Sequence, residues 1–455
     1  MAKEPEYLSP RISSELDDCS LPLTFDSYNR CSLSCRYCFS ESFKSNNPMF
    51  AGKEIPLQKI DVGKFFNKID GTGDKRSWTT HGDGARLYEH FFKNRFVLHW
   101  GGMADPFCYF ERKNGIGYEL LKGLAERNYP TLFSFKGPTV LDDKYLELFD
   151  QYKEQNNFAF QISIITADDA MGKRIEPGVP LPSERLRAMK VLSSMGYYTV
   201  LRLRPFIIGI TDHSLDDLLI KAKEAGADGL STEFFAMDGR CNAGMEKRFK
   251  EIQKLISCND IFKYFRDLSP SERGTYRRLN RLVKERHVKK MYKFCLENDM
   301  VFACSDPDYK ELSMSGCCCA MPENHPNPEM NNWSKNQLTY HLKEARKHYH
   351  RTGECKILEF DEVYGKYKTF MDDAALTHQN IGCTAYTYNI RTVITLREML
   401  QSKWNNVNAN SNPRNYLHGK IMPVGIDDAG KNLIYKYNPS EFEQRWADEG
   451  IDLTV

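Results

Sequence analysis

The sequence of 455 residues predicts an α/β fold built on a parallel sheet. Three observations lead to this class: short apolar, β-branched or aromatic runs recur, stretches with the period of an amphipathic helix separate them, and this alternation repeats about six times. A strand, a helix and a further strand in succession usually form a parallel pair, so the order favours one parallel sheet. Periodicity alone does not separate an open sheet from a barrel.

The expected strands are short runs rich in residues that favour extended structure. They are Leu21–Phe25, Phe96–Trp100, Thr131–Phe135, Phe158–Ile164, Thr199–Phe206 and Gly229–Phe235. The helices expected between them are Tyr118–Arg127, Asp143–Gln155, Pro182–Met195 and Ser214–Ala225. Gly196 and Gly226 follow two of these helices directly, where a left-handed glycine commonly ends a helix.

Outside this repeat the pattern changes. Residues 40–95 form a long connection with one expected helix, Leu57–Ile69, and are either a functional insertion or a surface excursion. After residue 240 we expect helices Glu246–Ile256, Tyr276–Glu297 and Lys335–Tyr349, a strand Met300–Cys304 and an Asn-rich loop at 401–415. The predicted organisation is an N-terminal segment (1–20), an α/β domain (21–240) and a mostly helical, Cys-rich C-terminal extension (241–455).

Composition narrows the class of protein. No apolar segment approaches the ~18 to 20 residues that cross a bilayer, so no membrane-spanning helix is expected. No apolar stretch follows Lys3, which is unlike a secretory signal. The 14 cysteines are therefore expected to be reduced thiols of a cytoplasmic protein.

Cys31, Cys35 and Cys38 stand in a C-x3-C-x2-C pattern close behind the first expected strand. One short loop of this kind can supply three of the four thiolates that an iron–sulfur cluster usually takes, which leaves one iron open to a small molecule. A structural zinc site would need four closed ligands, and no histidine lies near this loop. Three unrelated core cysteines, or a disulfide, would also be compatible with the spacing.

This spacing, the aromatic Tyr37 before the last cysteine and the position of the loop resemble the radical SAM superfamily. The resemblance implies a partial (β/α)6 TIM-type barrel with a [4Fe–4S] cluster on the three cysteines at the C-terminal mouth of the strands. It also implies that the open iron binds S-adenosylmethionine (SAM), with Tyr37 close to it. The reduced cluster would cleave SAM to a 5′-deoxyadenosyl radical, with electrons from a flavodoxin- or ferredoxin-type donor.

Further landmarks between Leu21 and Phe235 resemble the spore photoproduct lyase branch of that superfamily. Gly101 and Gly102 match a Gly-Gly-Glu motif whose glutamate engages the SAM amino group, but Met103 replaces the glutamate. The resemblance implies that the nearby Asp105 takes over this contact. The lyase also has a hydrogen-donating cysteine where alignment on Asp105 puts Gly102, with Cys108 a few residues further on, which separates this chain from photoproduct repair.

Other expected cofactor contacts lie at strand ends. By the same resemblance, Lys136 after the third strand and Ser163 at the end of the fourth would contact SAM. Arg202 and Arg204 alternate with leucines and therefore point to one side of their strand. If that side is the barrel interior, they would bind the SAM carboxylate or the substrate. If it is the outside, they would form salt bridges with helices.

The C-terminal third is rich in cysteine. Neighbours in an extended chain point to opposite sides, so Cys317 and Cys319, with Cys304 and either Cys355 or Cys383, could form a second iron–sulfur or zinc site. The alternative is that these are small buried core residues.

The segment from Arg266 to Lys293 carries ten Lys or Arg residues against three acids. Such a run is either a nucleic-acid surface, with Tyr276 and Tyr292 stacking on bases, or a solvated helix face. Three functions follow: a radical SAM enzyme acting on a nucleic acid or nucleotide-derived substrate, one acting on a peptide or small metabolite, or a non-catalytic, metal-stabilised nucleic-acid-binding protein.

Overall fold

The computed structural model divides into two compact units, each treated by itself. The barrel unit holds the described residues of 25–61 and 99–300, and the second unit those of 8–24, 62–98 and 301–455. The described residues are 10–13, 16–19, 21–40, 56–74, 85–238, 243–269, 276–331, 335, 337–373, 375–376 and 394–455.

Six strands follow one another as neighbours in the order of the sequence. They are β2 (Leu23–Phe25), β3 (Leu98–Trp100), β4 (Thr131–Phe135), β5 (Phe158–Ser163), β6 (Tyr198–Phe206) and β7 (Gly229–Phe234). The pairs from β4 to β7 are parallel. All six predicted strands are confirmed, and the α/β architecture is that expected of a partial (β/α)6 TIM-type barrel.

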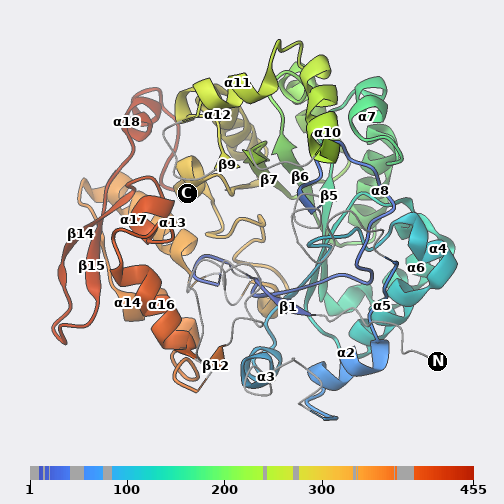
Figure 1. Cartoon of the computed structure of the whole chain (residues 1–455), viewed down its shortest axis with the longest axis horizontal. Helices are drawn as coiled ribbons and strands as arrows, with labels where there is room; N and C mark the ends of the chain where they lie inside the picture. Colours follow the sequence, from blue (N-terminus) through green and yellow to red (C-terminus); the bar gives the residue numbers. More distant parts are fainter. Residues whose placement is uncertain are drawn as a thin grey trace. The chain divides into compact units, whose positions relative to one another are not determined.

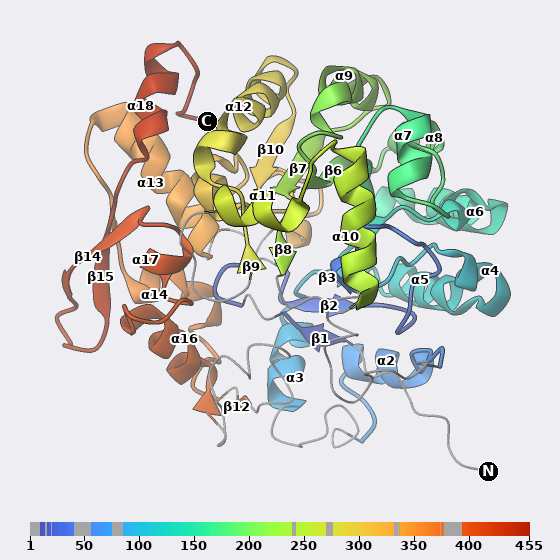
Figure 2. The same cartoon turned by 45° about the horizontal axis from the view of Figure 1, so that its top comes forward.

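Helices follow the strands as predicted and lie outside them in Figures 1 and 2. They are α5 (Ile116–Glu126), α6 (Asp143–Tyr152), α8 (Pro182–Ser194) and α9 (Leu215–Glu224), preceded by the short α4 (Tyr109–Asn114) and α7 (Asp169–Ile175). Gly196 and Gly226 have φ of +90° and +87°, in agreement with their expected role at helix ends.

The two faces of the sheet differ in chemistry. On the helix side, the Phe160 ring stacks on Phe133 with centroids 5.0 Å apart and meets Phe149 of α6 at 5.1 Å. Ser134 and Gln161, which directly follow Phe133 and Phe160, point to the opposite side, because side chains alternate along a strand. There Ser134 donates to Gln161 Oε1 at 2.7 Å. The inner face is therefore polar, whereas the outer face forms an aromatic core.

The barrel unit continues past residue 240, where we expected the C-terminal extension to begin. It adds α10 (Ala243–Leu255), α11 (Ile261–Asp267) and α12 (Arg281–Glu297). The predicted start of the last helix at Tyr276 was wrong, because Tyr276–Arg277 form β9, which pairs with β8 (Met237–Asp238). The Asn280 side chain accepts from Val283 N at 3.2 Å and caps α12, so the helix begins at Arg281.

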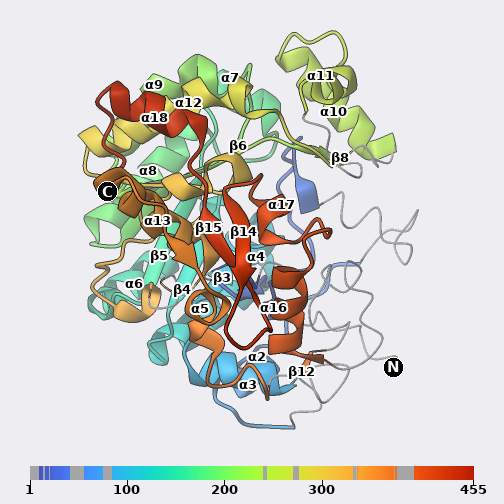
Figure 3. The same cartoon turned by 90° about the vertical axis from the view of Figure 1, so that its left-hand side faces the viewer.

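The second unit contains an antiparallel sheet of β11 (Ile357–Leu358), β15 (Leu433–Tyr437) and β14 (Ile421–Ile426), of which Figure 3 shows the last two side by side. It also contains α13 (Leu338–Thr352) and β10 (Val301–Cys304), close to their predicted places. The predicted Asn-rich loop was wrong in part. It holds the end of α16 (Leu396–Asn405) and α17 (Pro413–Tyr416), and the buried Asn412 bonds the carbonyl of Trp404 at 2.8 Å.

Residues near the N-terminus belong to this second unit and are held within it by buried ion pairs. Asp17 pairs with Lys403, and Asp18 pairs with Lys310 and accepts from Thr339 N at 2.9 Å. The same unit includes α2 (Val62–Ile69), which begins later than predicted, and α3 (Ala85–Lys93), which was not predicted. No helix in the described part of the chain is long and apolar enough to cross a membrane.

A buried carboxylate organises the start of the helical layer in the barrel unit. Glu111 of α4 accepts from the hydroxyls of Tyr28 and Tyr145, each at 2.5 Å, and from Gly117 N at 2.8 Å. Tyr118 N donates to it as well, at 3.0 Å. These four donors join the segment after β2, α5 and α6 around one buried side chain.

We expect Glu111→Gln to lower the free energy of unfolding by about 3 kcal/mol. The NH₂ group of the glutamine would face donors that now bond to a carboxylate oxygen, so buried donors would be left unpaired. Denaturant unfolding followed by circular dichroism measures this. The matched control is Glu126→Gln, an exposed residue 3.9 Å from Lys122, which should cost less than about 0.5 kcal/mol. Equal losses in both variants would contradict the structural role of Glu111.

Candidate metal centre

The three predicted ligands lie on one loop of the barrel unit, which we call the cluster loop (residues 31–38). Cys35 is buried, and Cys31 and Cys38 are half-buried. A tight turn brings Cys38 N to 3.2 Å from the carbonyl of Cys35, and Leu33 N lies 3.4 Å from the Cys31 sulfur. The three cysteines therefore lie on one compact loop, as their spacing in the sequence predicts.

The cluster loop is fastened to the segment that follows β5. Arg36 N donates to the carbonyl of Ile175 at 3.1 Å, and Arg36 Nε donates to the carbonyl of Arg174 at 2.7 Å. The Tyr37 hydroxyl donates to Glu176, which directly follows α7. Tyr37 is itself buried, so the aromatic between the second and third cysteines is locked in place.

Glu176 connects this loop to the strand ends. Its carboxylate accepts from Arg185 Nη2 at 2.5 Å, and Arg185 Nη1 donates to the carbonyl of Ser163 at 2.5 Å. The Lys136 Nζ lies 3.9 Å from Glu176 Oε1 and 5.4 Å from the centre of the Tyr37 ring. Of the residues predicted as cofactor contacts, Lys136 thus lies next to the cluster loop, and Ser163 is connected to the loop through Arg185 and Glu176. The sequence analysis assigned no role to Glu176 or Arg185.

The direction of the two arginines on β6 is now determined. Ser163 and Arg202 are register partners on parallel strands, and Arg202 Nη1 lies 3.5 Å from the Ser163 hydroxyl. Arg204 forms an ion pair with Glu233 of β7, whose other oxygen is 3.9 Å from Arg278. Both arginines therefore belong to the polar inner face, and the alternative of outward salt bridges with helices was wrong.

Gly101 meets the backbone of β4. Its φ is +103°, and a Cβ there would lie 2.1 Å from the carbonyl oxygen of Ser134. The close approach that the glycine permits is therefore to a neighbouring strand. Gly102, the next predicted contact, is half-buried.

Asp105 serves the backbone of the same region. It accepts from the amides of Phe107 at 2.9 Å, Lys136 at 2.5 Å and Gly137 at 3.0 Å. Burial raises its pKa to about 6, and these amide bonds act in the opposite direction. The geometry assigns Asp105 a structural role between the loop after β3 and the end of β4. The contact to the SAM amino group stays an untested prediction.

A fourth thiol, Cys108, reaches the cluster loop. A hydrogen bond between the Cys31 and Cys108 side chains, followed by burial, raises the pKa of Cys31, and the same bond lowers the pKa of Cys108. Burial raises the pKa of Cys35 to about 12, which Lys136 opposes and Glu176 reinforces. Cys108 therefore lies beside Cys31, and a hydrogen-donating role for it stays an untested prediction.

The donor chemistry of the cluster loop suits an iron–sulfur cluster. Three thiols are soft ligands, one is fully enclosed, and a lysine ammonium lies nearby to favour thiolate charge. Within the described ranges, no set of three His, Cys, Asp or Glu side chains is arranged to hold a single metal ion. The cluster that the resemblance implies needs several thiolate ligands from one short segment. The three cysteines fit it, because all are thiols and all lie on one loop.

The second predicted metal site has little geometry to support it. Cys304 and Cys317 are buried in the second unit, and the Cys317 sulfur is 3.3 Å from the Ser315 hydroxyl. Cys355 is half-buried, and Cys383 lies outside the described residues. The Cys319 sulfur is 3.8 Å from that of its neighbour Cys318. A metal at this site stays a prediction.

The basic segment from Arg266 to Lys293 is divided by the fold. Lys284 is buried with its Nζ 5.9 Å from the Phe234 ring centre, and Tyr292 is buried, so its predicted stacking on bases was wrong. The exposed basic residues of α12 are Arg286, Lys290 and Lys293. Their spacing places these three on one side of the helix.

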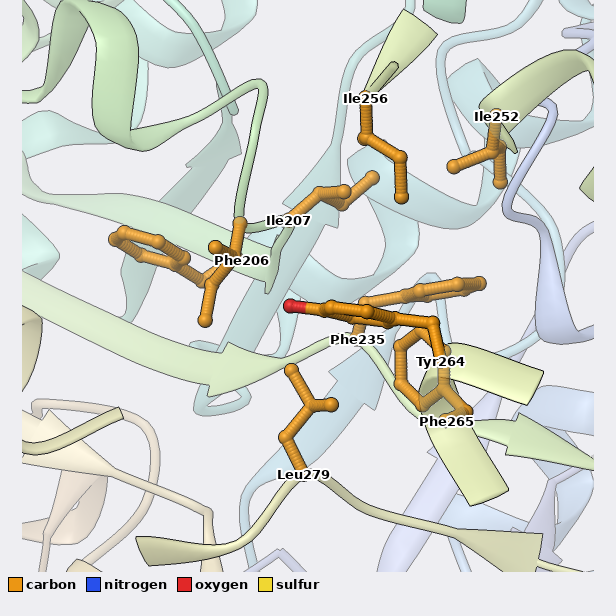
Figure 4. Close-up of a pocket in the computed structure, with 9 residues that line it drawn as sticks. Phe206, Ile207, Phe235, Ile252, Ile256, Tyr264, Phe265 and Leu279 are labelled. Atoms are coloured by element: carbon orange, nitrogen blue, oxygen red, sulfur yellow. The ribbon is translucent and has the colours of Figure 1, made fainter. Parts of the chain in front are cut away.

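An apolar hollow lies where β6 and β7 end (Figure 4). The hollow is shallow, with a cavity volume of about 10 Å³. Figure 4 shows the Tyr264 ring among apolar side chains. The lining residues are Phe206, Ile207, Ile208, Phe235, Ile252, Ile256, Tyr264, Phe265 and Leu279.

Comparison with known proteins gives distant similarities. No family model matches the chain. Uncharacterised proteins of Mycobacterium bovis and Mycobacterium tuberculosis are 22% identical over 210 residues, which is 46% of this chain and 57% of theirs. The chain therefore matches little more than half the length of these curated relatives.

Among solved structures, spore photoproduct lyase complexed with dinucleoside spore photoproduct has a TM-score of 0.45 at 12% identity, covering 66% of this chain and 80% of that chain. Streptococcus suis SuiB bound to S-adenosylmethionine has a TM-score of 0.36 at 13% identity, covering 63% of this chain and 51% of that chain.

We expect Gly101→Ala to destabilise the protein by about 3 kcal/mol, because it combines a left-handed φ with overlap against the backbone of Ser134. The control is Gly196→Ala, which shares a positive φ of +90° but meets no atom within 4 Å, and should cost about 1 kcal/mol. Chemical denaturation of both variants gives the difference. Equal costs would argue against the contact with β4.

Proposed function

We propose that the chain is a radical SAM enzyme. The observation that carries the proposal is the cluster loop with Cys31, Cys35 and Cys38, fastened through Tyr37 and Glu176 to Lys136 and Ser163 at the ends of β4 and β5. A three-thiol loop at the C-terminal ends of parallel strands places reactive chemistry where barrel enzymes carry it.

The residues of the barrel unit would divide the work as follows. The three cysteines would hold a [4Fe–4S] cluster, and such a cluster, when bound and reduced, would supply the one electron for cleavage of SAM to methionine and a 5′-deoxyadenosyl radical. Lys136 and Ser163, and Arg202 beside Ser163, offer an ammonium, a hydroxyl and a guanidinium to the polar groups of SAM. The inner face orients the substrate and keeps water from the reacting atoms. The electron would come from a flavodoxin- or ferredoxin-type protein.

Anaerobic reconstitution tests the proposal. We expect the wild-type chain to bind a [4Fe–4S] cluster and to form 5′-deoxyadenosine from SAM and dithionite, detected by chromatography. Single Cys→Ala variants at positions 31, 35 and 38 should lose the product, whereas Cys295→Ala, a buried cysteine of α12, should keep it. A fully loaded wild type that forms no 5′-deoxyadenosine would favour a structural metal and a binding function instead.

We propose a nucleic acid or nucleotide-derived compound as the substrate class, ahead of a peptide or small metabolite. The support is the row of Arg286, Lys290 and Lys293 on the exposed side of α12. Lys290 pairs with Asp216 at 2.8 Å, but both side chains are open to solvent, so a phosphate can compete.

We expect binding to single-stranded DNA or RNA to weaken steeply with salt, as counterion release requires. Replacing Arg286, Lys290 and Lys293 by Gln should reduce the slope of log K against log salt by about 2 to 3, roughly one for each lost phosphate contact. The matched control replaces Lys122, Lys153 and Lys254, exposed lysines of the same unit. Equal slopes in both triple variants, measured by fluorescence anisotropy, would exclude α12 as the contact surface.

A further inference from the structure

Glu176 is the most enclosed charge around the cluster loop. Its side chain is 0% exposed, that of Arg185 is 2% exposed and that of Lys136 is 13% exposed. A buried carboxylate is tolerated only when counter-charges and hydrogen bonds surround it. Arg185 supplies the counter-charge, and the Tyr37 hydroxyl supplies a further hydrogen bond.

The partners of Glu176 come from three separate parts of the barrel unit. Tyr37 belongs to the cluster loop, Lys136 follows β4, and Arg185 of α8 also holds the carbonyl of Ser163 at the end of β5. One carboxylate therefore holds together the loop that carries the thiols and the strand ends that carry the proposed SAM contacts. The charges of Glu176 and Lys136 also both act on the Cys35 thiol.

We propose that Glu176 is the positioning residue of the cluster site, and that its negative charge holds the reduction potential of the bound cluster down. This inference rests on the proposed function, since it concerns a cluster on Cys31, Cys35 and Cys38. Glu176 acts through Tyr37, Lys136 and Arg185 and is not itself a catalytic residue.

The two parts of this role respond to different substitutions. Glu176→Gln keeps the length and one acceptor oxygen but removes the charge, and loss of a nearby negative charge makes a cluster easier to reduce. Glu176→Asp keeps the charge but shortens the side chain by one methylene. It then cannot reach both Tyr37 and Arg185, so the arrangement of the SAM contacts is loosened while the charge stays.

The experiment measures the midpoint potential of the cluster by EPR-monitored titration and the affinity for SAM by equilibrium binding, in the full chain. We expect a more positive potential in Glu176→Gln. We expect an unchanged potential in Glu176→Asp with about tenfold weaker SAM binding, the factor that follows from losing about 1.4 kcal/mol. A Gln variant with the wild-type potential, or an Asp variant with the wild-type affinity, overturns the inference.

Two further variants separate this role from loss of stability. Glu311→Gln removes another fully buried carboxylate that pairs with a lysine, Lys420, in the second unit, and should lower the melting temperature without moving the potential. Glu176→Gln combined with Arg185→Met removes both charges of the buried pair, so the potential should return toward that of the wild type. If Glu176→Gln alone does not fold, the double variant can still be measured, because it leaves no unpaired buried charge at this pair.

The outcomes distinguish failure of the proposed function from failure of this inference alone. A wild-type chain that takes up no cluster refutes the proposed function and this inference with it. A wild-type chain with a cluster, in which Glu311→Gln moves the potential as far as Glu176→Gln does, refutes the inference alone.

Discussion

The barrel unit depends on the alternation of side chains along its parallel strands. Among the residues that point outward, Phe133 stacks on Phe160, and Phe160 packs against Phe149 of α6 and Tyr197. Because side chains alternate with a period of two, the packing of these rings also sets the direction of the residues between them. A slip of one residue in register would bury Ser134 and Gln161 among aromatic rings. The position of every polar group on the inner face therefore follows from the hydrophobic core on the outer face.

Two carboxylates then fix the loops around the strand ends, and they do so in different ways. Asp105 is satisfied by backbone amides of its own turn and of residues 136 and 137, so it shapes the chain path. Glu176 is satisfied by side chains from distant segments, so it joins parts that the backbone does not connect. A substitution at Asp105 should therefore disturb the backbone of one region, whereas one at Glu176 loosens the contacts between separate segments. Both carboxylates also act on the thiols, Asp105 on Cys31 and Glu176 on Cys35.

The repeating strands and helices of the fold could be predicted from the sequence, because the periods of strands and helices are local properties. The six strands appear near their predicted ends, and the spacing of Cys31, Cys35 and Cys38 correctly indicated one compact loop. The predictions that were wrong concern features that depend on contacts between separate residues. The capping of α12 by Asn280 and the bonding of Asn412 to Trp404 turn Asn-containing segments into helix ends. Likewise, no local signal told which side of β6 carries Arg202, since this depends on its pairing with Ser163.

The chemistry of the inner face argues for a binding surface inside the barrel unit. The interior of an ordinary TIM barrel is filled by layers of branched apolar side chains. Here His99 Nε2 lies 2.8 Å from the Ser134 hydroxyl, which donates to Gln161, and further along the strands stand Ser163, Arg202 and the pair Arg204–Glu233. Burying such groups costs free energy even when their hydrogen bonds are satisfied, and apolar residues of the same volume would often be more stable. A row of polar side chains across β3 to β7 therefore suits the charged and hydrogen-bonding ligand that we propose, and the same strands place Lys136 5.4 Å from the centre of the Tyr37 ring.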